Sequence, residues 1–289
     1  MKKPELTLFF IVEPPMYQNL ACYLAASIKE QFDEPIALIG YCPSHKISEL
    51  DPKAVGVLEK MGVEIRGFDV EGAFDPAYPH GNKILACLEK RDTPYSGFVD
   101  SDVLFLKKNK IANILNPGKV SLTPAASIYW AKRELWPTIY GEFGMDVPED
   151  RIYLARQKGR PKVPYFSSGF FTFPEGILPN LGKRFSEVWM DAAQTIDAIE
   201  GLENKRPYLD QMSLPVAIKR AGLDYHLMPE EQHWILGGSM RNEPFPKERN
   251  IFTVHYRKWS ILTENGLSAL GKDILLKQAG VKKVAHFTL

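Results

Sequence analysis

The chain has 289 residues, and its 36 basic and 35 acidic side chains leave a formal net charge of only +1. This balance argues against non-specific nucleic-acid binding, which requires a basic excess. A hydrophobic content of 45% and a charged content of 25% are typical of a globular protein with a sizeable core. The length suggests one large domain or two small ones, and no convincing linker divides the chain.

Cysteine usage and the first apolar run predict the cellular location. Cys22, Cys42 and Cys87 are widely spaced and form no Cys-x-x-Cys motif, as expected of small buried residues in a reducing compartment. No apolar run is long enough to span a membrane. The run over residues 6–12 is too short for a signal peptide and is stopped by the polar and proline residues 13–15, so it predicts a first strand. We therefore expect a cytoplasmic protein without a transmembrane segment.

The first hundred residues alternate between strand-like and helix-like segments. Apolar and extended patterns predict strands over residues 6–12, 35–41, 63–68 and 95–106. Helical spacing and start or stop signals predict helices over residues 17–32, 51–61 and 82–90. Within the second helix, Asp51 is the expected N-cap and Gly62 follows the last turn. The alternating order predicts an α/β fold with a parallel, right-handed, Rossmann-like sheet, whose ligands bind beyond the carboxyl ends of the strands.

Two further features of the sequence concern the ligand and the domain organisation. No Gly-x-Gly-x-x-Gly follows the first strand, so the dinucleotide-binding fingerprint is absent. Residues 107–165 are less regular and rich in Pro, Trp, Tyr and charge, which suits an insertion or a lobe that faces a second substrate.

Asp100 and Asp102 lie two residues apart within the strongly apolar segment 98–106. Buried carboxylates are costly unless they are paired, hydrogen-bonded or bound to a metal. A spacing of two places both side chains on the same side of an extended chain, where Mg²⁺ or Mn²⁺ can bind and keep positions open for phosphate. The alternative is a pair that caps a strand end or accepts backbone hydrogen bonds. The pattern predicts a metal site that holds a diphosphate.

Small polar residues begin a later strand, predicted over residues 165–173. Ser167, Ser168 and Gly169 would allow a ligand to approach the backbone closely. The alternative is a plain core strand with a bulge.

Two predicted helix starts carry polar groups. Asp210 lies near the start of a helix predicted from residue 208, where it could be the N-cap or could hold sugar hydroxyl groups. Asn82 and Lys83 lie at the start of an earlier helix, a position that favours phosphate. The alternative for Lys83 is a solvated helix face.

A late strand predicted over residues 252–259 ends in His255, the two bases Arg257 and Lys258, and Trp259. The two bases can neutralise phosphate, so His255 fits a metal–diphosphate site, although a satisfied core histidine is the alternative. The remaining histidines lack such neighbours; they are His45, His80, His226, His233 and His286.

Taken in order, these segments resemble the GT-A glycosyltransferases, especially the glycogenin and galactosyltransferase-like group known as family 8. Asp100-Ser101-Asp102 resembles the Asp-x-Asp motif of that fold, and Asp210-Gln211 resembles the Asp-Gln pair beside the transferred sugar. The segment from Ser167 to Phe170 is similar to the Asn-Ser-Gly-Val segment of the family, with Ser in place of Asn. His255 resembles the late His that completes the metal site; residues 256–259 stand where the family usually has Gly, Lys, Pro and Trp.

The resemblance implies a mostly parallel GT-A sheet flanked by helices, in a single domain over residues 1–289. Residues 1–106 would be the nucleotide-binding half, and residues 107–289 the smaller acceptor-side portion that completes the metal site. The implied donor is a nucleoside diphosphate sugar, with UDP as the expected nucleotide, and the acceptor is an unidentified glycan, lipid or protein.

The resemblance also implies roles for individual residues. Mn²⁺ or Mg²⁺ would be bound by Asp100, Asp102 and His255. Nucleotide or diphosphate contacts would come from Val12, Glu13, Asn82, Lys83, Ser101, Arg257 and Lys258. Sugar or acceptor contacts would come from Ser167, Ser168, Gly169 and Trp259.

The catalytic residues would be Asp210 and Gln211. In a retaining reaction the Gln211 carbonyl would support an oxocarbenium-like centre, and in an inverting one Asp210 could be the base. The sequence leaves both open. Two alternatives also remain, a sugar-nucleotide nucleotidyltransferase and a non-catalytic nucleotide-sugar-binding protein. The first usually has a Gly-rich basic loop after its first strand, which residues 13–15 lack.

Overall fold

The computed structural model describes residues 3–128, 131–132, 134–157, 159–203, 205–243 and 245–284. A seven-stranded sheet forms its centre, in the order β10-β6-β7-β4-β1-β2-β3. Neighbouring strands are parallel except that β7 is antiparallel to both β4 and β6. The strands are β1 (Leu6–Ile11), β2 (Ile36–Pro43), β3 (Val63–Phe68), β4 (Tyr95–Val99), β6 (Val120–Pro124), β7 (Phe166–Pro174) and β10 (Tyr225–Leu227). The expected α/β fold with a mostly parallel central sheet is therefore confirmed.

The helices of the first half follow the sequence closely. They are α1 (Tyr17–Gln31), α2 (Pro52–Lys60) and α3 (Asn82–Leu88). Asp51 caps α2 by accepting a hydrogen bond from the Lys53 amide at 2.9 Å, and Gly62 follows that helix with a φ of +78°. These signals were readable because caps and left-handed glycines act within one turn of the helix end.

The prediction of one strand over residues 95–106 is wrong. The chain turns after β4, with the Val103 amide donating to the Asp100 carbonyl at 3.1 Å, and then forms β5 (Val103–Phe105). β5 leaves the central sheet and pairs antiparallel with β12 (Thr253–His255) in a small sheet that also contains β11 (Trp234–Ile235). The residues on both sides of the turn are buried, each in a different sheet, so the apolar run conceals the turn.

The second half departs from its predictions in two places. Residues 107–165 are more than an insertion, because they supply β6 to the central sheet. The helix predicted from residue 208 begins at Lys205, so Asp210 lies in its second turn and is not its N-cap. The later helices are α4 (Leu135–Glu142), α5 (Phe185–Ala198), α6 (Lys205–Arg220), α7 (Trp259–Glu264) and α8 (Ser268–Ala279). The remaining elements are the hairpin of β8 (Ile177–Leu178) and β9 (Lys183–Arg184), and 3₁₀ turns at Ser44–Glu49, Pro79–Gly81, Ile111–Asn113, Glu230–Gln232 and Gly238–Met240.

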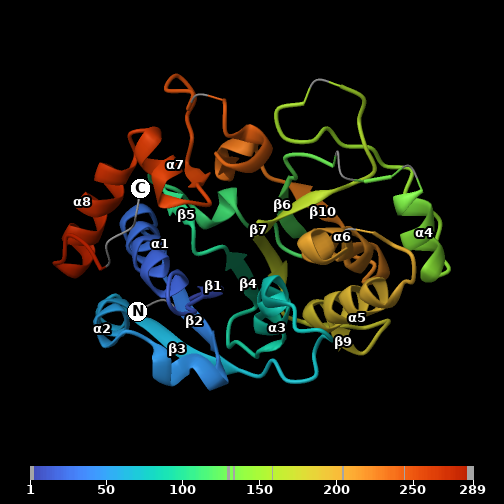
Figure 1. Cartoon of the computed structure of the whole chain (residues 1–289), viewed down its shortest axis with the longest axis horizontal. Coiled ribbons are helices and arrows are strands. Elements are labelled where there is room, and N and C mark those ends of the chain that lie inside the picture. Colours follow the sequence, from blue (N-terminus) through green and yellow to red (C-terminus); the bar gives the residue numbers. More distant parts are fainter. Residues whose placement is uncertain are drawn as a thin grey trace.

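Side-chain alternation along β1 divides the core between the two faces of the sheet. Leu8 and Phe10 pack into a cluster with α1 and α8, whereas Phe9 packs into a cluster with α5 and α6. Figure 1 shows α1, α2, α7 and α8 at one end of the molecule and α4, α5 and α6 at the other, with α8 alongside α1. Burying a single large apolar side chain contributes about 1.5–3 kcal/mol, so each cluster contributes substantially to the stability of the sheet.

A buried arginine links the end of α3 to the end of β7 in the central sheet. The Arg91 guanidinium lies 2.7 Å from a Glu175 carboxylate oxygen and 4.2 Å from the centre of the Phe9 ring. It also donates to the carbonyls of Ala86 and Cys87, at 2.9 and 2.8 Å, near the end of α3. This charge is paired and hydrogen-bonded, as burial requires.

Two remaining expectations concern cysteines and membranes. Cys22, Cys42 and Cys87 are free and fully buried, as their spacing predicted. Among the described helices, none is both long and apolar enough to cross a membrane.

Candidate metal and donor site

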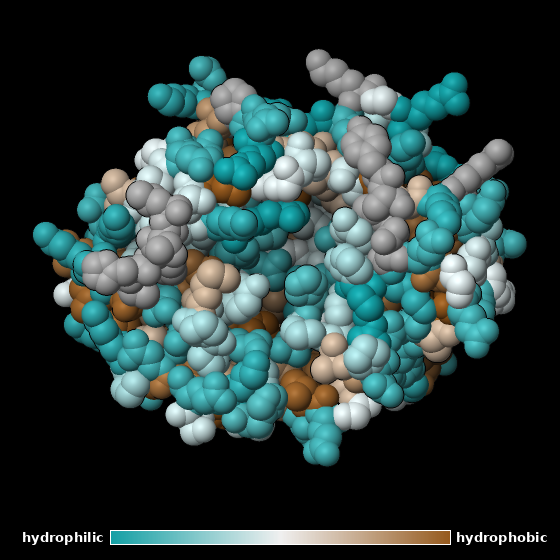
Figure 2. Space-filling model, in the orientation of Figure 1, coloured by the Kyte–Doolittle hydropathy of each residue, from teal (hydrophilic) through white to brown (hydrophobic). Residues whose placement is uncertain are grey.

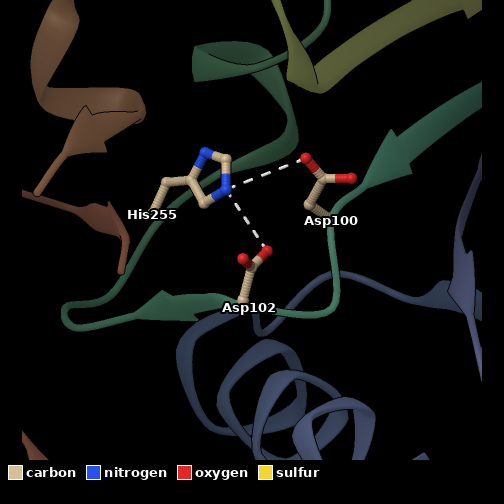
Figure 3. Close-up of side chains that lie close together, drawn as sticks. All are labelled: Asp100, Asp102 and His255. Atoms are coloured by element: carbon tan, nitrogen blue, oxygen red, sulfur yellow. Dashed lines mark ion pairs between the residues drawn. The ribbon is translucent and has the colours of Figure 1, made fainter. Parts of the chain in front are cut away.

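Three side chains from different parts of the chain converge where β4 ends. Asp100 follows β4, Asp102 precedes β5, and His255 ends β12 (Figure 3). The His255 Nε2 lies 3.2 Å from Asp102 Oδ1 and 3.8 Å from Asp100 Oδ2, and the three ligand atoms lie within 4.8 Å of one another. We call these three residues the metal trio.

Pairing in the small sheet creates this convergence. His255 lies opposite Val103 in the antiparallel register of β12 and β5, which brings it beside Asp102. The Tyr256 amide also donates to the Asp102 carbonyl at 3.0 Å. The turn at residues 100–102 then directs the Asp100 carboxylate toward the same point, so the trio depends on the turn that the sequence pattern concealed.

Gly169 leaves the space beside these ligands open. Its carbonyl accepts a hydrogen bond from the Asp100 amide at 2.7 Å. A Cβ at this position would lie 2.8 Å from Asp100 Oδ2 and 2.9 Å from His255 Cε1, closer than ordinary contact allows. Two carboxylates and one imidazole around such a space are a donor set suited to a divalent metal ion, because carboxylates bind hard cations and imidazole binds transition-metal ions.

The Asp102 carboxylate carries the negative charge that a cation requires. Burial, the largest single cause, would raise the pKa of Asp102, but His255, a backbone hydrogen bond and Lys83 together outweigh burial and lower the pKa, so the carboxylate stays ionised near neutral pH.

Lys83 joins the trio to a second acidic group. Its ammonium lies 3.1 Å from Asp100 Oδ1 and 3.1 Å from Asp210 Oδ2. Burial would lower the pKa of Lys83, but the two carboxylates outweigh burial and raise the pKa, so Lys83 is charged. Asp210 also accepts a hydrogen bond from Ser168 Oγ at 2.6 Å, and Tyr78 OH lies 3.4 Å from its other oxygen. The site is therefore a linked network of acids and one buried cation.

Figure 2 shows that this face of the molecule is hollowed near its middle, in the region of β4 and β7, with hydrophilic side chains around the hollow.

A match to a known protein family shows which kind of protein contains this network. Residues 8–222 match the family described as the Rhodobacterales glycosyltransferase domain. The chain is a member of this glycosyltransferase family. The match covers Asp100, Asp102, Lys83 and Asp210, and it decides against a sugar-nucleotide nucleotidyltransferase. No curated protein matches the sequence.

The fold of this glycosyltransferase is similar to that of several solved structures. The galactosyltransferase LgtC, in complex with donor and acceptor sugar analogues, is 13% identical with a TM-score of 0.53, and the match covers 97% of this chain and 98% of LgtC. An active-site mutant of LgtC gives the same coverage and identity with a TM-score of 0.56. Mouse xyloside xylosyltransferase 1 is 13% identical over 87% of this chain and 97% of its own, with a TM-score of 0.50. The expected GT-A fold is therefore confirmed.

Of the residues predicted to contact the nucleotide, Glu13, Asn82 and Ser101 lie near the end of β1, whereas Arg257 and Lys258 follow β12. The Asn82 amide donates to Glu13 at 3.1 Å, and Glu13 also forms an ion pair with Lys46, a residue that no sequence pattern indicated. Ser101 Oγ donates to the Ile11 carbonyl, so this hydroxyl helps to hold the turn against β1. Val12 is fully buried, and its amide donates to the Tyr41 carbonyl at 2.7 Å. The Val12 side chain is therefore part of the core and does not contact a ligand as predicted.

His233 lies beside the metal trio, although its neighbours in the sequence did not predict this position. Its Nε2 lies 3.1 Å from Ser167 Oγ, and its ring centre lies 5.0 Å from that of His255. Burial, with His255 as a further cause, lowers the pKa of His233 well below its usual value, so the ring is neutral. The His233 ring packs beside that of His255, and only the pairing of β11 with β12 could have revealed this contact.

The predicted sugar contacts are not all brought together. Ser168 and Gly169 lie at the trio and at Asp210, and Ser167 contacts His233. Trp259, by contrast, is 8% exposed, and its ring centre lies 4.4 Å from that of Tyr23 in the hydrophobic core. The structure therefore gives Trp259 a packing role, because the first turn of α7 places its ring against α1.

Proposed function

We propose that this glycosyltransferase moves a sugar from a nucleoside diphosphate sugar, with UDP as the nucleotide, to a glycan, lipid or protein acceptor. The observation that carries the proposal is the convergence of Asp100, Asp102 and His255 beside the Lys83–Asp210 pair. Mn²⁺ or Mg²⁺ would be held by the metal trio. When bound, such an ion neutralises the diphosphate leaving group as the sugar departs.

The chain's own residues divide into a diphosphate side and a sugar side. Glu13, Asn82 and Ser101 lie beyond the end of β1, where the nucleotide of an open α/β sheet is expected. Arg257 and Lys258 are exposed immediately after the trio and would bring positive charge to the phosphates.

Asp210 and Gln211 form the sugar side. The Asp210 carboxylate is already in contact with Lys83, Ser168 and Tyr78, which occupy most of its lone pairs. We therefore assign Asp210 to orienting sugar hydroxyls, and we assign the half-buried Gln211, the next residue of α6, to the reacting face of the sugar.

A screen of nucleotide sugars tests this function. Purified protein is incubated with Mn²⁺ and each of several UDP- and GDP-sugars, and both binding and release of the nucleoside diphosphate are measured. We expect one UDP-sugar to bind and to be slowly hydrolysed, with loss of both on adding EDTA. Equal binding of all sugars with and without Mn²⁺ would contradict the metal assignment, and binding without any turnover would favour a non-catalytic protein.

A further inference from the structure

Arg257 has an unusual backbone conformation just after the metal trio. Its φ is +59°, in the left-handed region that residues other than glycine rarely adopt. The Lys258 amide donates to the Tyr256 carbonyl at 2.6 Å, so Arg257 is the central residue of a three-residue turn. This kind of turn with positive φ at its centre is rare and strained. A strained position persists only where the surroundings hold it.

Two glycines of a neighbouring segment make room for the Arg257 side chain. A Cβ at Gly237 would lie 2.6 Å from Arg257 Cδ and 3.1 Å from Cγ, too close to be tolerated without movement. A Cβ at Gly238 would lie 3.3 Å from Nη1, and Gly238 itself has a φ of +60°. The aliphatic stem therefore lies on Gly237 and the guanidinium lies over Gly238. We call these two residues the glycine shelf.

The shelf is fixed relative to the metal trio by hydrogen bonds. Ile235 pairs with His255 in the parallel register of β11 and β12, and the Leu236 amide donates to the His255 carbonyl at 2.9 Å. On the other side of Arg257, the Tyr256 amide donates to the Asp102 carbonyl. The glycine shelf and Arg257 are thus both hydrogen-bonded to the segments that carry the metal trio.

The guanidinium is available for an anion. Two other arginines of this region, Arg156 and Arg241, pair with glutamates. Among the described residues no ion pair involves Arg257, and its side chain is exposed. A guanidinium held by packing rather than by a carboxylate keeps its donors free for phosphate oxygens.

We infer that Gly237 and Gly238 are positioning residues, which hold the Arg257 guanidinium where it binds the diphosphate of the donor. The inference rests on the proposed function for the identity of the anion, whereas the contact itself is independent of any ligand. It explains how the chain manages without glycine in the segment after His255: Arg257 adopts the left-handed conformation itself, and the glycines are on the facing segment.

A double-mutant cycle in thermal melts tests the contact. Gly237→Ala should lower the melting temperature, because the new methyl group meets the Arg257 stem. The same change in an Arg257→Ala background should have little effect, because the atoms it meets are gone. Gly56→Ala is the matched control: Gly56 is exposed in α2, a Cβ there meets nothing within 4 Å, and no loss is expected. Equal losses from Gly237→Ala in both backgrounds would overturn the shelf.

Calorimetry with Mn²⁺ and UDP tests the role in binding. Arg257→Ala should weaken UDP by about tenfold, the usual effect of a lost charge-assisted hydrogen bond. Gly238→Ala, which crowds the guanidinium, should weaken UDP to a similar extent and add little to Arg257→Ala. Uridine, which lacks phosphate, should bind all variants equally. Wild-type UDP affinity in both single variants would overturn the inference, whereas a wild-type protein that does not bind Mn²⁺ and UDP would instead refute the proposed function, with the thermal cycle still reporting on the shelf.

Discussion

The ammonium nitrogen of Lys83 lies 3.1 Å from a carboxylate oxygen of Asp210, and this contact joins the first turn of α3 to the second turn of α6. Both side chains are largely buried. Asp210 therefore meets a cation, not the free amides that an N-cap would meet. A change at Asp210 removes no helix cap but does break this buried pair, so melting temperatures must accompany the kinetics at this position.

Changes at Asp210 and Gln211 should separate chemistry from nucleotide binding. Asp210→Asn and Gln211→Ala should lower turnover of the donor sugar by about 100-fold or more, because their contacts act on the sugar in the transition state. Affinity for UDP with Mn²⁺ should change little, since neither residue is assigned to the nucleotide. Steady-state kinetics and calorimetry on the same preparations check this. Unchanged turnover with a lowered melting temperature would mean that Asp210 has only a structural role.

Removal of one charge from the metal trio should abolish metal binding and preserve the fold. Asp102→Asn keeps the shape of the side chain but removes the anion that a hard cation requires. We expect loss of Mn²⁺-dependent UDP binding in calorimetry and of bound Mn²⁺ in electron paramagnetic resonance, with an unchanged circular dichroism spectrum. A variant that binds Mn²⁺ and UDP as the wild type does would refute the site.

The Arg91–Glu175 pair should matter for stability and not for metal binding. Glu175→Gln leaves the Arg91 charge buried without its anion, and breaking a buried pair in this way costs about 3–5 kcal/mol. Asp33→Asn removes one partner of the exposed Lys108–Asp33 pair and should cost less than about 1 kcal/mol. Urea denaturation of both variants gives the comparison. Similar losses in the two would show that the buried network adds no more than a surface pair.

The three cysteines should be unreactive in the native protein. Burial is the main cause that raises the pKa of Cys22 to about 12 and of Cys42 to about 11. In an unfolded chain these thiols ionise at about pH 8.5. Their raised pKa values therefore contribute to the free energy of unfolding below that pH, and this contribution is lost as the pH rises from there toward the pKa values of the folded protein. At pH 8 a disulfide reagent should label no thiol of the folded protein and all three in denaturant. Rapid labelling without denaturant would contradict the burial.

Local patterns determined the order of elements and most of their limits. The strand at residues 63–68 and the α2 helix with its Asp51 cap were predicted correctly because a cap, a positive-φ glycine and an apolar run act over a few residues. The same local signals, read together with a family resemblance, picked out Asp100, Asp102 and His255. The sequence could name these side chains because buried acids and a histidine beside two bases are unusual on any fold.

Only the tertiary structure decided how these residues meet. The turn at residues 100–102 was invisible because the apolar residues beside it are buried in two different sheets, and Asp210 was misplaced because its helix begins in a polar segment. His233 and the Lys83–Asp210 pair depend on strands and helices that lie far apart along the chain. Such contacts leave no mark on neighbouring residues, since what brings them together is the pairing of β12 with β5 and the packing of α3 and α6 on the sheet.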